Sequence, residues 1–208
     1  MNLLQHFPLN TEGIDYVVGD IHGNFSQLTK KLEEIGFEKG RDRLFSVGDI
    51  IDRGAESCNV LPWLEQSRTW FFPVRGNHED MIIKGNPSFW NGASWFKSIL
   101  PQEQTRIIDE FNSWPLIIEV ETSLGLVGVM HASCPVKDWE ELQDEALLHK
   151  LEALILWDRT FKTRTIQNIS CIYHGHTHVD IPLQLGNVIY IDTDLNYDGS
   201  LLTVRKLQ

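Results

Sequence analysis

Short apolar runs recur along the chain, and each of them stops at a cluster of polar residues and glycines. They cover residues 14–18, 44–47, 70–74, 126–130 and 169–173. Continuous apolar runs of this length, bounded by turn-forming residues, are typical of buried β-strands. We therefore expect five buried strands, each followed by polar side chains.

Helical patterns separate several of these runs. Residues 26–37 carry apolar side chains, including Ile35, on one side of a helix, and residues 138–156 form a longer amphipathic stretch. Residues 115–130 instead contain two apolar runs around a short turn, which predicts a hairpin. Strands that alternate with helices indicate an α/β fold, and the hairpin makes its sheet mixed. In such sheets ligands bind beyond the carboxyl ends of the strands, where the polar clusters lie.

Composition and charge narrow the class of protein. The chain has 208 residues, of which 42% are hydrophobic and 23% charged, so we expect one globular domain over residues 1–208. Its formal net charge of −11 argues against a broad nucleic-acid or anionic-membrane surface, because both need a basic face. A small anionic substrate held by a few arginines remains compatible with this charge.

Cysteine usage and the start of the chain favour the cytoplasm. Cys58, Cys134 and Cys171 are few, odd in number and far apart, which fits reduced thiols better than a disulfide framework. Residues 1–13 lack a positive start and a sustained apolar core, so we expect no signal peptide. No apolar stretch approaches the length of a membrane-spanning helix.

The polar residues at the ends of the runs combine carboxylate, imidazole, amide and guanidinium groups. They are Asp20, His22, Asp49, Asp52, Arg53, Arg75, Asn77, His78, His131 and His176. Carboxylate, imidazole and amide oxygen together suit manganese or iron, and no thiolate motif accompanies them. A single zinc ion needs only three or four ligands, whereas six or seven ligands suit two metals.

The order of these motifs identifies a family resemblance. GDIHG (19–23), GDIIDRG (48–54), GNHE (76–79), HA (131–132) and GHT (175–177) resemble the calcineurin-like metallophosphoesterases. Within that family the chain is similar to the protein serine/threonine phosphatases, especially the small bacterial and phage lambda-type enzymes. The resemblance implies a mixed β-sandwich flanked by helices, with a dimetal site at the carboxyl ends of the strands.

The resemblance also implies the metal ligands and the nucleophile. Asp20 and His22 would bind the first metal, Asp49 would bridge, and Asn77, His131 and His176 would bind the second. We expect both ions to be manganese, with iron or zinc as alternatives. Two metals so held lower the pKa of a shared water, so that hydroxide can attack the phosphoryl group near neutral pH.

Five further residues match the family's catalytic and phosphate-binding positions. His78 resembles the general acid that protonates the leaving alkoxide, and Asp52 the carboxylate that orients it. Arg53, Arg75 and Arg159 match phosphate-binding arginines, whose planar guanidinium groups suit bidentate capture of phosphoryl oxygens.

The chain departs from the lambda-type pattern at two positions near this site. His178 stands where proline usually follows GHT, so it is a candidate seventh ligand, on the first metal; a packing role is the alternative. His174, before the glycine turn, is expected to pack. Asp194 stands where the subgroup tends to have glycine. Both departures leave the substrate open.

Four functions remain in competition. The leading one is a phosphomonoesterase acting on phosphoserine, phosphothreonine or phosphotyrosine in proteins, or on small phosphate esters. The second is a hydrolase of dinucleoside polyphosphates, which needs an aromatic side chain such as Trp157 or Trp139 to stack a nucleobase. A phosphodiesterase or nuclease is third, favoured by GHTH and disfavoured by the acidic charge. The fourth is a metal-bound scaffold without catalysis, which the complete motif set disfavours.

Overall fold

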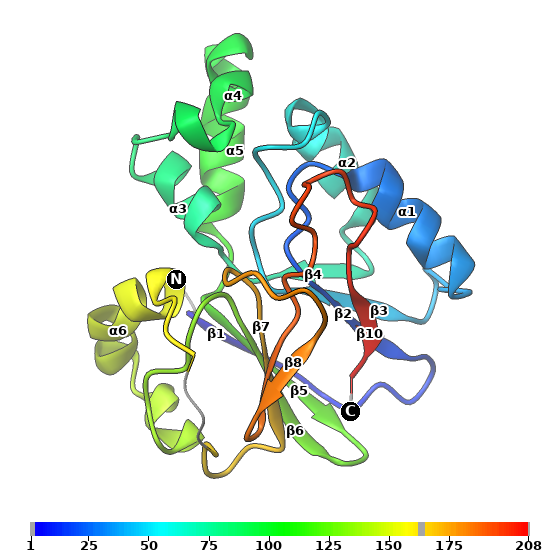
Figure 1. The fold of residues 1–208 in the computed structure, drawn as a ribbon, viewed down its shortest axis with the longest axis vertical. Helices are drawn as coiled ribbons and strands as arrows, with labels where there is room; N and C mark the ends of the chain where they lie inside the picture. Colours follow the sequence, from blue (N-terminus) through cyan, green and yellow to red (C-terminus); the bar gives the residue numbers. More distant parts are fainter. Residues whose placement is uncertain (1–2, 162–164, 208) are drawn as a thin grey trace.

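The computed structural model describes residues 3–161 and 165–207, and these form two β-sheets with helices on both sides (Figure 1). One sheet has six strands in the order β1-β5-β6-β7-β9-β8, and the other has four in the order β10-β2-β3-β4. The strands are β1 (Leu4–Phe7), β2 (Asp15–Val18), β3 (Arg43–Ser46), β4 (Phe71–Pro73), β5 (Ile117–Thr122), β6 (Gly125–Met130), β7 (Cys171–His174), β8 (Leu183–Leu185), β9 (Val188–Tyr190) and β10 (Val204–Lys206).

The helices lie in the connections between the strands. The α-helices are α1 (Phe25–Glu34), α2 (Val60–Ser67), α3 (Asn77–Ile83), α4 (Ser94–Ser98), α5 (Pro101–Asn112) and α6 (Glu145–Trp157). Three 3₁₀ helices are present in the described residues: η1 (Ser57–Asn59), η2 (Phe89–Asn91) and η3 (Trp139–Gln143).

Three apolar layers hold the sheets and helices together. The inner faces of the two sheets share one core cluster, in which Val17 and Phe45 of one sheet pack with Val129 of the other. α1 and α2 cover the outer face of the four-stranded sheet, while η3 and α6 cover the six-stranded sheet (Figure 1). The fold is therefore the expected mixed sandwich flanked by helices.

The five predicted strands are confirmed as β2, β3, β4, β6 and β7. β2, β3 and β4 pair in parallel, as do β6 and β7, so their carboxyl ends lie at shared sheet edges. The predicted hairpin is also confirmed, because β5 and β6 pair antiparallel around a two-residue turn. These pairings make the six-stranded sheet mixed.

Two helix predictions need correction. The first helix ends at Glu34, and Ile35 is 40% exposed beyond it, because Gly36 turns the chain away with φ +71°. The stretch 138–156 is two helices rather than one. The Asp144 side chain accepts a hydrogen bond from the backbone N–H of Ala146 at 2.9 Å, so η3 ends there and α6 begins. None of the helices in the described ranges is both long and apolar enough to cross a membrane.

Candidate dimetal active site

The segments that follow β2, β3, β4, β6 and β7, including the first turn of α3, bring the predicted ligands together. All eight polar side chains concerned are almost fully buried at these strand ends: Asp20, His22, Asp49, Asp52, Asn77, His78, His131 and His176. The prediction that residues far apart in the chain meet at the sheet edges is thus met by the geometry.

Asp49 is shared by two clusters of side chains that could hold metal ions. One consists of His22, Asp49 and His78, and the other of Asp49, His131 and His176; within each, the ligand atoms lie within 4.8 Å of one another. Asp49 could therefore contribute a ligand atom to an ion in each cluster. The geometry puts His78 in the first cluster, a position that the motif pattern had given to Asp20.

Asn77 and Asp20 lie directly beside these clusters. The Asn77 Oδ1 atom is 2.9 Å from His131 Nε2 and 2.8 Å from His176 Nδ1. The Asp20 Oδ2 atom is 3.9 Å from His22 Nε2, and both Asp20 oxygens accept the His176 backbone N–H at 3.2 Å. All six residues predicted as ligands from the resemblance therefore lie within one buried region.

Backbone carbonyls select the tautomers of two histidines. His22 Nδ1 donates to the Ile51 carbonyl at 2.9 Å, and His131 Nδ1 donates to the Val47 carbonyl at 2.8 Å. The Nε2 lone pairs then face the clusters, as a metal ligand requires. His131 Nε2 also lies 3.4 Å from Asp49 Oδ1, so acceptor atoms converge on one point.

Burial keeps these imidazoles neutral. It lowers the pKa of His22 to about 3 and that of His176 to about 3, and it also lowers the pKa of His131. Burial alone would raise the pKa of Asp49, but the facing imidazoles of His131, His78 and His22 hold that pKa below its usual value. The result is neutral nitrogen ligands around an ionised carboxylate.

The donor set and two orphaned nitrogens fit bound cations. In the described part of the chain, no lysine or arginine forms an ion pair with Asp20 or Asp49, although both carboxylates are buried. His176 Nε2 and His178 Nδ1 are likewise buried without a hydrogen-bond partner among the described residues. Buried charges and polar atoms normally have partners, and metal ions would supply them.

The backbone is strained at several of these side chains. His22, Asp49, Asp52, Arg53 and His176 all have positive φ, between 46° and 70°. Left-handed backbone in non-glycine residues is uncommon and clusters at functional sites. Gly175 allows the close approach of two loops, because a Cβ there would lie 1.9 Å from Asp20 Oδ1.

Glu79, the last residue of the GNHE motif, also belongs to the site, although the sequence analysis assigned it no role. Its fully buried carboxylate accepts backbone N–H groups from Gly76 at 2.9 Å, Asp49 at 3.0 Å and Ile50 at 3.0 Å. It thereby joins the start of α3 to the strained turn that carries Asp49. A glutamate three residues after Gly76 at a helix start was the available signal, since such glutamates commonly cap helices.

His78 and Asp52 form a hydrogen-bonded pair at the edge of the first cluster. His78 Nδ1 donates to Asp52 Oδ2 at 2.7 Å, and Trp95 Nε1 donates to the other Asp52 oxygen at 2.7 Å. Burial lowers the pKa of His78, but the Asp49 and Asp52 carboxylates outweigh burial and raise that pKa above its ordinary value. These carboxylates therefore favour a protonated imidazole, whereas the Arg53 guanidinium, 3.5 Å from His78 Nε2, acts in the opposite direction on that pKa.

The three predicted phosphate-binding arginines are held in different ways. Arg75 is buried, donates to the Trp114 carbonyl at 3.5 Å and lies 3.9 Å from Asp80. Arg159 donates to the His176 carbonyl at 2.6 Å, which ties it to the second cluster. Arg53 lies beside His78, with its guanidinium over the Tyr197 ring.

His178 and His174 occupy different surroundings. The His178 side chain is 28% exposed, its Nε2 lies 3.8 Å from Asp180, and it is in neither three-residue cluster. His174 is buried, with Nδ1 3.3 Å from the Met130 carbonyl and its ring beside Tyr190. The seventh-ligand prediction for His178 therefore stays a prediction.

Asp192 is a buried carboxylate near the site that motif reasoning missed. Burial first, and the Asp49 charge second, raise its pKa to about 6. Burial also raises the pKa of Asp20, and the Asp192 charge adds to that rise. None of the five motifs that carry the family resemblance includes Asp192.

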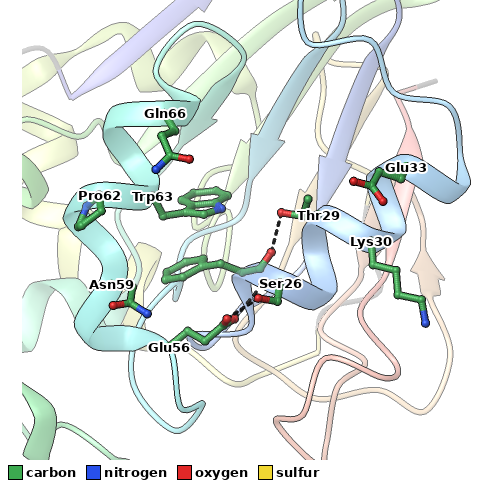
Figure 2. Close-up of a pocket in the computed structure, with 10 residues that line it drawn as sticks. Ser26, Thr29, Lys30, Glu33, Glu56, Asn59, Pro62, Trp63 and Gln66 are labelled. Carbon is green, nitrogen blue, oxygen red and sulfur yellow. Dashed lines mark hydrogen bonds between the residues drawn. The ribbon is translucent and has the colours of Figure 1, made fainter.

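A surface groove between α1 and α2 lies apart from these clusters (Figure 2). It measures about 500 Å³, and its floor contains the Phe25 and Trp63 rings, stacked with centroids 4.6 Å apart. Figure 2 shows Ser26 hydrogen-bonded to Glu56 at one end of the groove. None of the predicted site residues lines it.

Comparisons with known proteins decide the family. The family model described as calcineurin-like phosphoesterase matches residues 16–180. The chain belongs to the calcineurin-like phosphoesterase family. This phosphoesterase is 35% identical over 202 residues to serine/threonine-protein phosphatase 1 of Salmonella typhimurium, covering 91% of this chain and 90% of that protein.

Two further matches have lower sequence identity. Identity to a symmetrical bis(5'-nucleosyl)-tetraphosphatase of Aromatoleum aromaticum is 25%, covering 69% of this chain and 52% of that protein. Among solved structures, a putative diadenosine tetraphosphatase superposes with a TM-score of 0.64 at 19% identity, covering 100% of this chain and 99% of that one. This structural likeness supports the fold alone. The family makes the phosphoesterase a hydrolase of phosphoester bonds and implies a dimetal site, for which the described histidines and aspartates provide ligands.

Proposed function

We propose that this phosphoesterase is a metal-dependent phosphomonoesterase that hydrolyses phosphoserine and phosphothreonine esters in proteins, with phosphotyrosine and small phosphate esters as further substrates. The observation that carries the proposal is the His78–Asp52 pair, joined at 2.7 Å and placed beside the Asp49-centred clusters. A serine or threonine alkoxide is a poor leaving group, so its departure requires a proton donor in this position. The similarity to bacterial serine/threonine phosphatases over most of the chain supports the same substrate class.

The proposed metal ligands divide around Asp49. Asp20 and His22 would hold one ion together with His178, and Asn77, His131 and His176 the other, with Asp49 between them. When bound, two divalent ions lower the pKa of water and withdraw negative charge from phosphoryl oxygens. Manganese is proposed because carboxylate, imidazole and amide ligands without thiolates suit it; iron and zinc are alternatives. Elemental analysis after manganese reconstitution should find two ions per chain, and at most one would contradict this assignment.

The chain's own groups would bind the substrate and move a proton. Arg53, Arg75 and Arg159 would orient the phosphate by charge-assisted hydrogen bonds to its oxygens. His78, kept protonated by its carboxylate partners, would transfer the proton on Nε2 to the leaving oxygen. Asp52 and Trp95 would keep the imidazole in that orientation. We also propose a cytoplasmic location, on the basis of the sparse cysteines.

One observation favours a second candidate, hydrolysis of dinucleoside polyphosphates. Trp157 is 44% exposed and its ring lies 6.4 Å from the His176 ring, so it could stack a nucleobase near the site. Trp139, the other predicted stacking residue, cannot do so. It is 1% exposed, and its Nε1 donates to Glu119 at 2.5 Å in the interior.

A substrate panel at fixed manganese tests the proposal. It compares phosphoserine and phosphothreonine peptides, a phosphotyrosine peptide, diadenosine tetraphosphate and an aryl phosphodiester by kcat/KM. We expect the phosphoserine or phosphothreonine peptides to rank first. Preference for diadenosine tetraphosphate, reduced by Trp157→Ala, would support the second candidate instead. A preference for the diester, or no turnover of any member, would also reject the proposal.

A further inference from the structure

Tyr197 contacts two residues of the candidate site from the loop between β9 and β10. The Arg53 guanidinium carbon lies 4.1 Å from the centre of its ring, and the His22 ring meets it edge-on at 5.3 Å. We propose that Tyr197 is a positioning residue, whose ring holds the Arg53 guanidinium in the orientation that binds the substrate phosphate. The inference rests on the proposed phosphate-binding role of Arg53.

Arg53 differs from the other two arginines in what holds it. Arg75 and Arg159 each donate to a backbone carbonyl, at 3.5 Å and 2.6 Å. Among the described residues, Arg53 forms no ion pair with a carboxylate, and the polar side-chain atom nearest its guanidinium is His78 Nε2 at 3.5 Å. Guanidinium planes stack on aromatic rings, so the Tyr197 face is the group that restricts the rotation of Arg53.

The loop that carries Tyr197 is itself fixed. The buried Asp194 carboxylate accepts the backbone N–H of Gly199 at 2.6 Å and that of Leu201 at 3.4 Å. Asp194 was noted as a departure from the lambda-type pattern, and here its carboxylate closes the turn that presents the ring. Tyr197 itself has a left-handed backbone, with φ 54°.

A second tie joins this loop to the segment that carries His22. The buried Asn24 side chain donates to the Tyr197 carbonyl at 3.0 Å and to the Ile21 carbonyl at 3.0 Å. A Cβ on Gly199 would lie 2.5 Å from the Gln27 Cβ, so the loop packs closely against the start of α1. The ring is therefore held from both sides before any substrate binds, and little ordering is needed when phosphate arrives.

Removing the ring should weaken phosphate binding more than it slows the chemical step. In Tyr197→Leu the guanidinium loses its platform, and the dissociation constant for inorganic phosphate should rise by about three- to tenfold. KM for a phosphopeptide should rise by a similar factor while kcat changes less. Tyr197→Phe keeps the ring and should restore the affinity. Tyr197→Met, which is flexible and has no aromatic face, serves as a second ring-less variant if the leucine variant is unstable.

A double-mutant cycle with Arg53→Gln separates positioning from a general structural effect. Phosphate binding to the manganese-loaded protein is measured by calorimetry for wild type, Tyr197→Leu, Arg53→Gln and the double variant, without turnover. We expect Tyr197→Leu to have almost no effect once Arg53 is gone, because the two residues then no longer act together. Elemental analysis of each variant should still find the wild-type manganese content.

Each other outcome overturns the inference. Equal losses in both backgrounds would show that Tyr197 acts independently of Arg53, and loss of manganese in Tyr197→Leu would show that it supports His22 instead. A phenylalanine variant as weak as the leucine variant would assign the effect to the hydroxyl. Because binding of phosphate is measured directly, failure of the wild type to hydrolyse phosphopeptides would reject the proposed function alone, whereas failure to bind phosphate rejects this inference.

Discussion

At the scale of single residues, the nitrogen atoms of the histidines define the chemistry of the site. His22 and His131 each give one nitrogen to a backbone carbonyl and turn the other toward the clusters. His78 gives one nitrogen to a carboxylate instead, which raises its pKa against the effect of burial. The group that accepts the hydrogen bond from Nδ1 thus determines the role of each histidine. A backbone carbonyl leaves a neutral metal ligand, whereas a carboxylate favours a proton donor.

His78→Asn should distinguish substrates by their leaving groups. Turnover of a phosphoserine peptide should fall by about 10²–10⁴-fold, because the departing alkoxide needs the proton. Turnover of an aryl phosphate with a good leaving group should fall far less, since a stable phenolate needs little protonation. Steady-state kinetics on both substrates, with manganese content measured, checks this. Equal losses with both metals retained would exclude His78 as the acid.

Asp52→Asn should change the pH profile of the phosphopeptide reaction. Activity needs protonated His78 and is lost as the pH rises through the His78 pKa. Burial lowers this pKa, while the Asp49 and Asp52 carboxylates raise it, so removal of the Asp52 charge should move the alkaline limb toward lower pH. Profiles of kcat for wild type and variant make the comparison, and coincident alkaline limbs would contradict it.

His178→Ala and His174→Ala should separate a ligand from a packing histidine. If His178 binds the first metal, its removal should raise the manganese concentration for half-maximal activity by about 10–100-fold. His174 bonds to the Met130 carbonyl and packs on Tyr190, so its alanine variant should leave that requirement almost unchanged. Manganese titrations of both variants decide, and identical titrations would leave the site with six ligands.

At the scale of elements, the site depends on turns at strand ends being held by the start of α3. The Glu79 carboxylate connects the turn after β3 to this helix through three backbone N–H groups. The strained turn at Asp49, with φ 49°, thus has its own hydrogen-bond support.

Glu79→Gln should therefore lower stability and metal affinity together. The amide would place an N–H₂ group against buried N–H donors, which costs about 1–3 kcal/mol of unfolding free energy. Because Asp49 belongs to both clusters, both metal sites should weaken. Urea unfolding of the EDTA-treated protein and manganese calorimetry measure the two effects.

A matched control for this variant is Glu103→Gln. Glu103 also lies in the first turn of a helix, where it accepts the Leu100 N–H at 3.3 Å, but it is exposed. Glu103→Gln should lower the free energy of unfolding far less than Glu79→Gln does, leaving it within about 0.5 kcal/mol of the wild-type value. Equal losses of unfolding free energy in the two variants would contradict a stabilising role for the buried Glu79 carboxylate.

At the scale of the whole molecule, buried carboxylates from both sheets meet at the site. Asp20 and Asp49 follow strands of the four-stranded sheet, and Asp192 follows β9 of the six-stranded sheet. Burial raises the pKa of both Asp20 and Asp192. Repulsion from the neighbouring carboxylates, Asp192 for Asp20 and Asp49 for Asp192, raises these pKa values further. Metal binding should therefore stabilise the sandwich as a whole.

Asp192→Asn should stabilise the metal-free protein and reduce the stabilisation that manganese provides. At pH 8, above its pKa of about 6, Asp192 is ionised, so the asparagine removes repulsion and should raise the Tm of the EDTA-treated protein. The increase in Tm on adding manganese should be smaller than in wild type, because ligand-linked stabilisation follows affinity. Scanning calorimetry with EDTA and with manganese tests both, using Asp180→Asn, whose side chain is fully exposed, as the control. An unchanged manganese increment would contradict the prediction.

Much of the fold and site could be predicted from local sequence. Apolar runs that end in glycine and polar residues determined β2, β3, β4, β6 and β7, because burial on both faces requires continuous apolar strands. The motifs following them identified Asp20, Asp49 and the other candidate ligands, since the strand ends come together in this topology. The expected helix boundaries were wrong where a single side chain ends one helix and caps the next, as Asp144 does between η3 and α6.

The tertiary structure alone decided which partners each side chain meets. Arg53 and Tyr197 are separated by more than a hundred positions in the chain, yet they stack because the loop after β9 folds over the turn after β3. The burial of Asp192 and of Trp139 likewise depends on which sheet and helix cover them. Hydrophobic periodicity reports the face of an element, whereas pKa values, cation–π contacts and hydrogen-bond partners depend on distances between elements, which no local pattern contains.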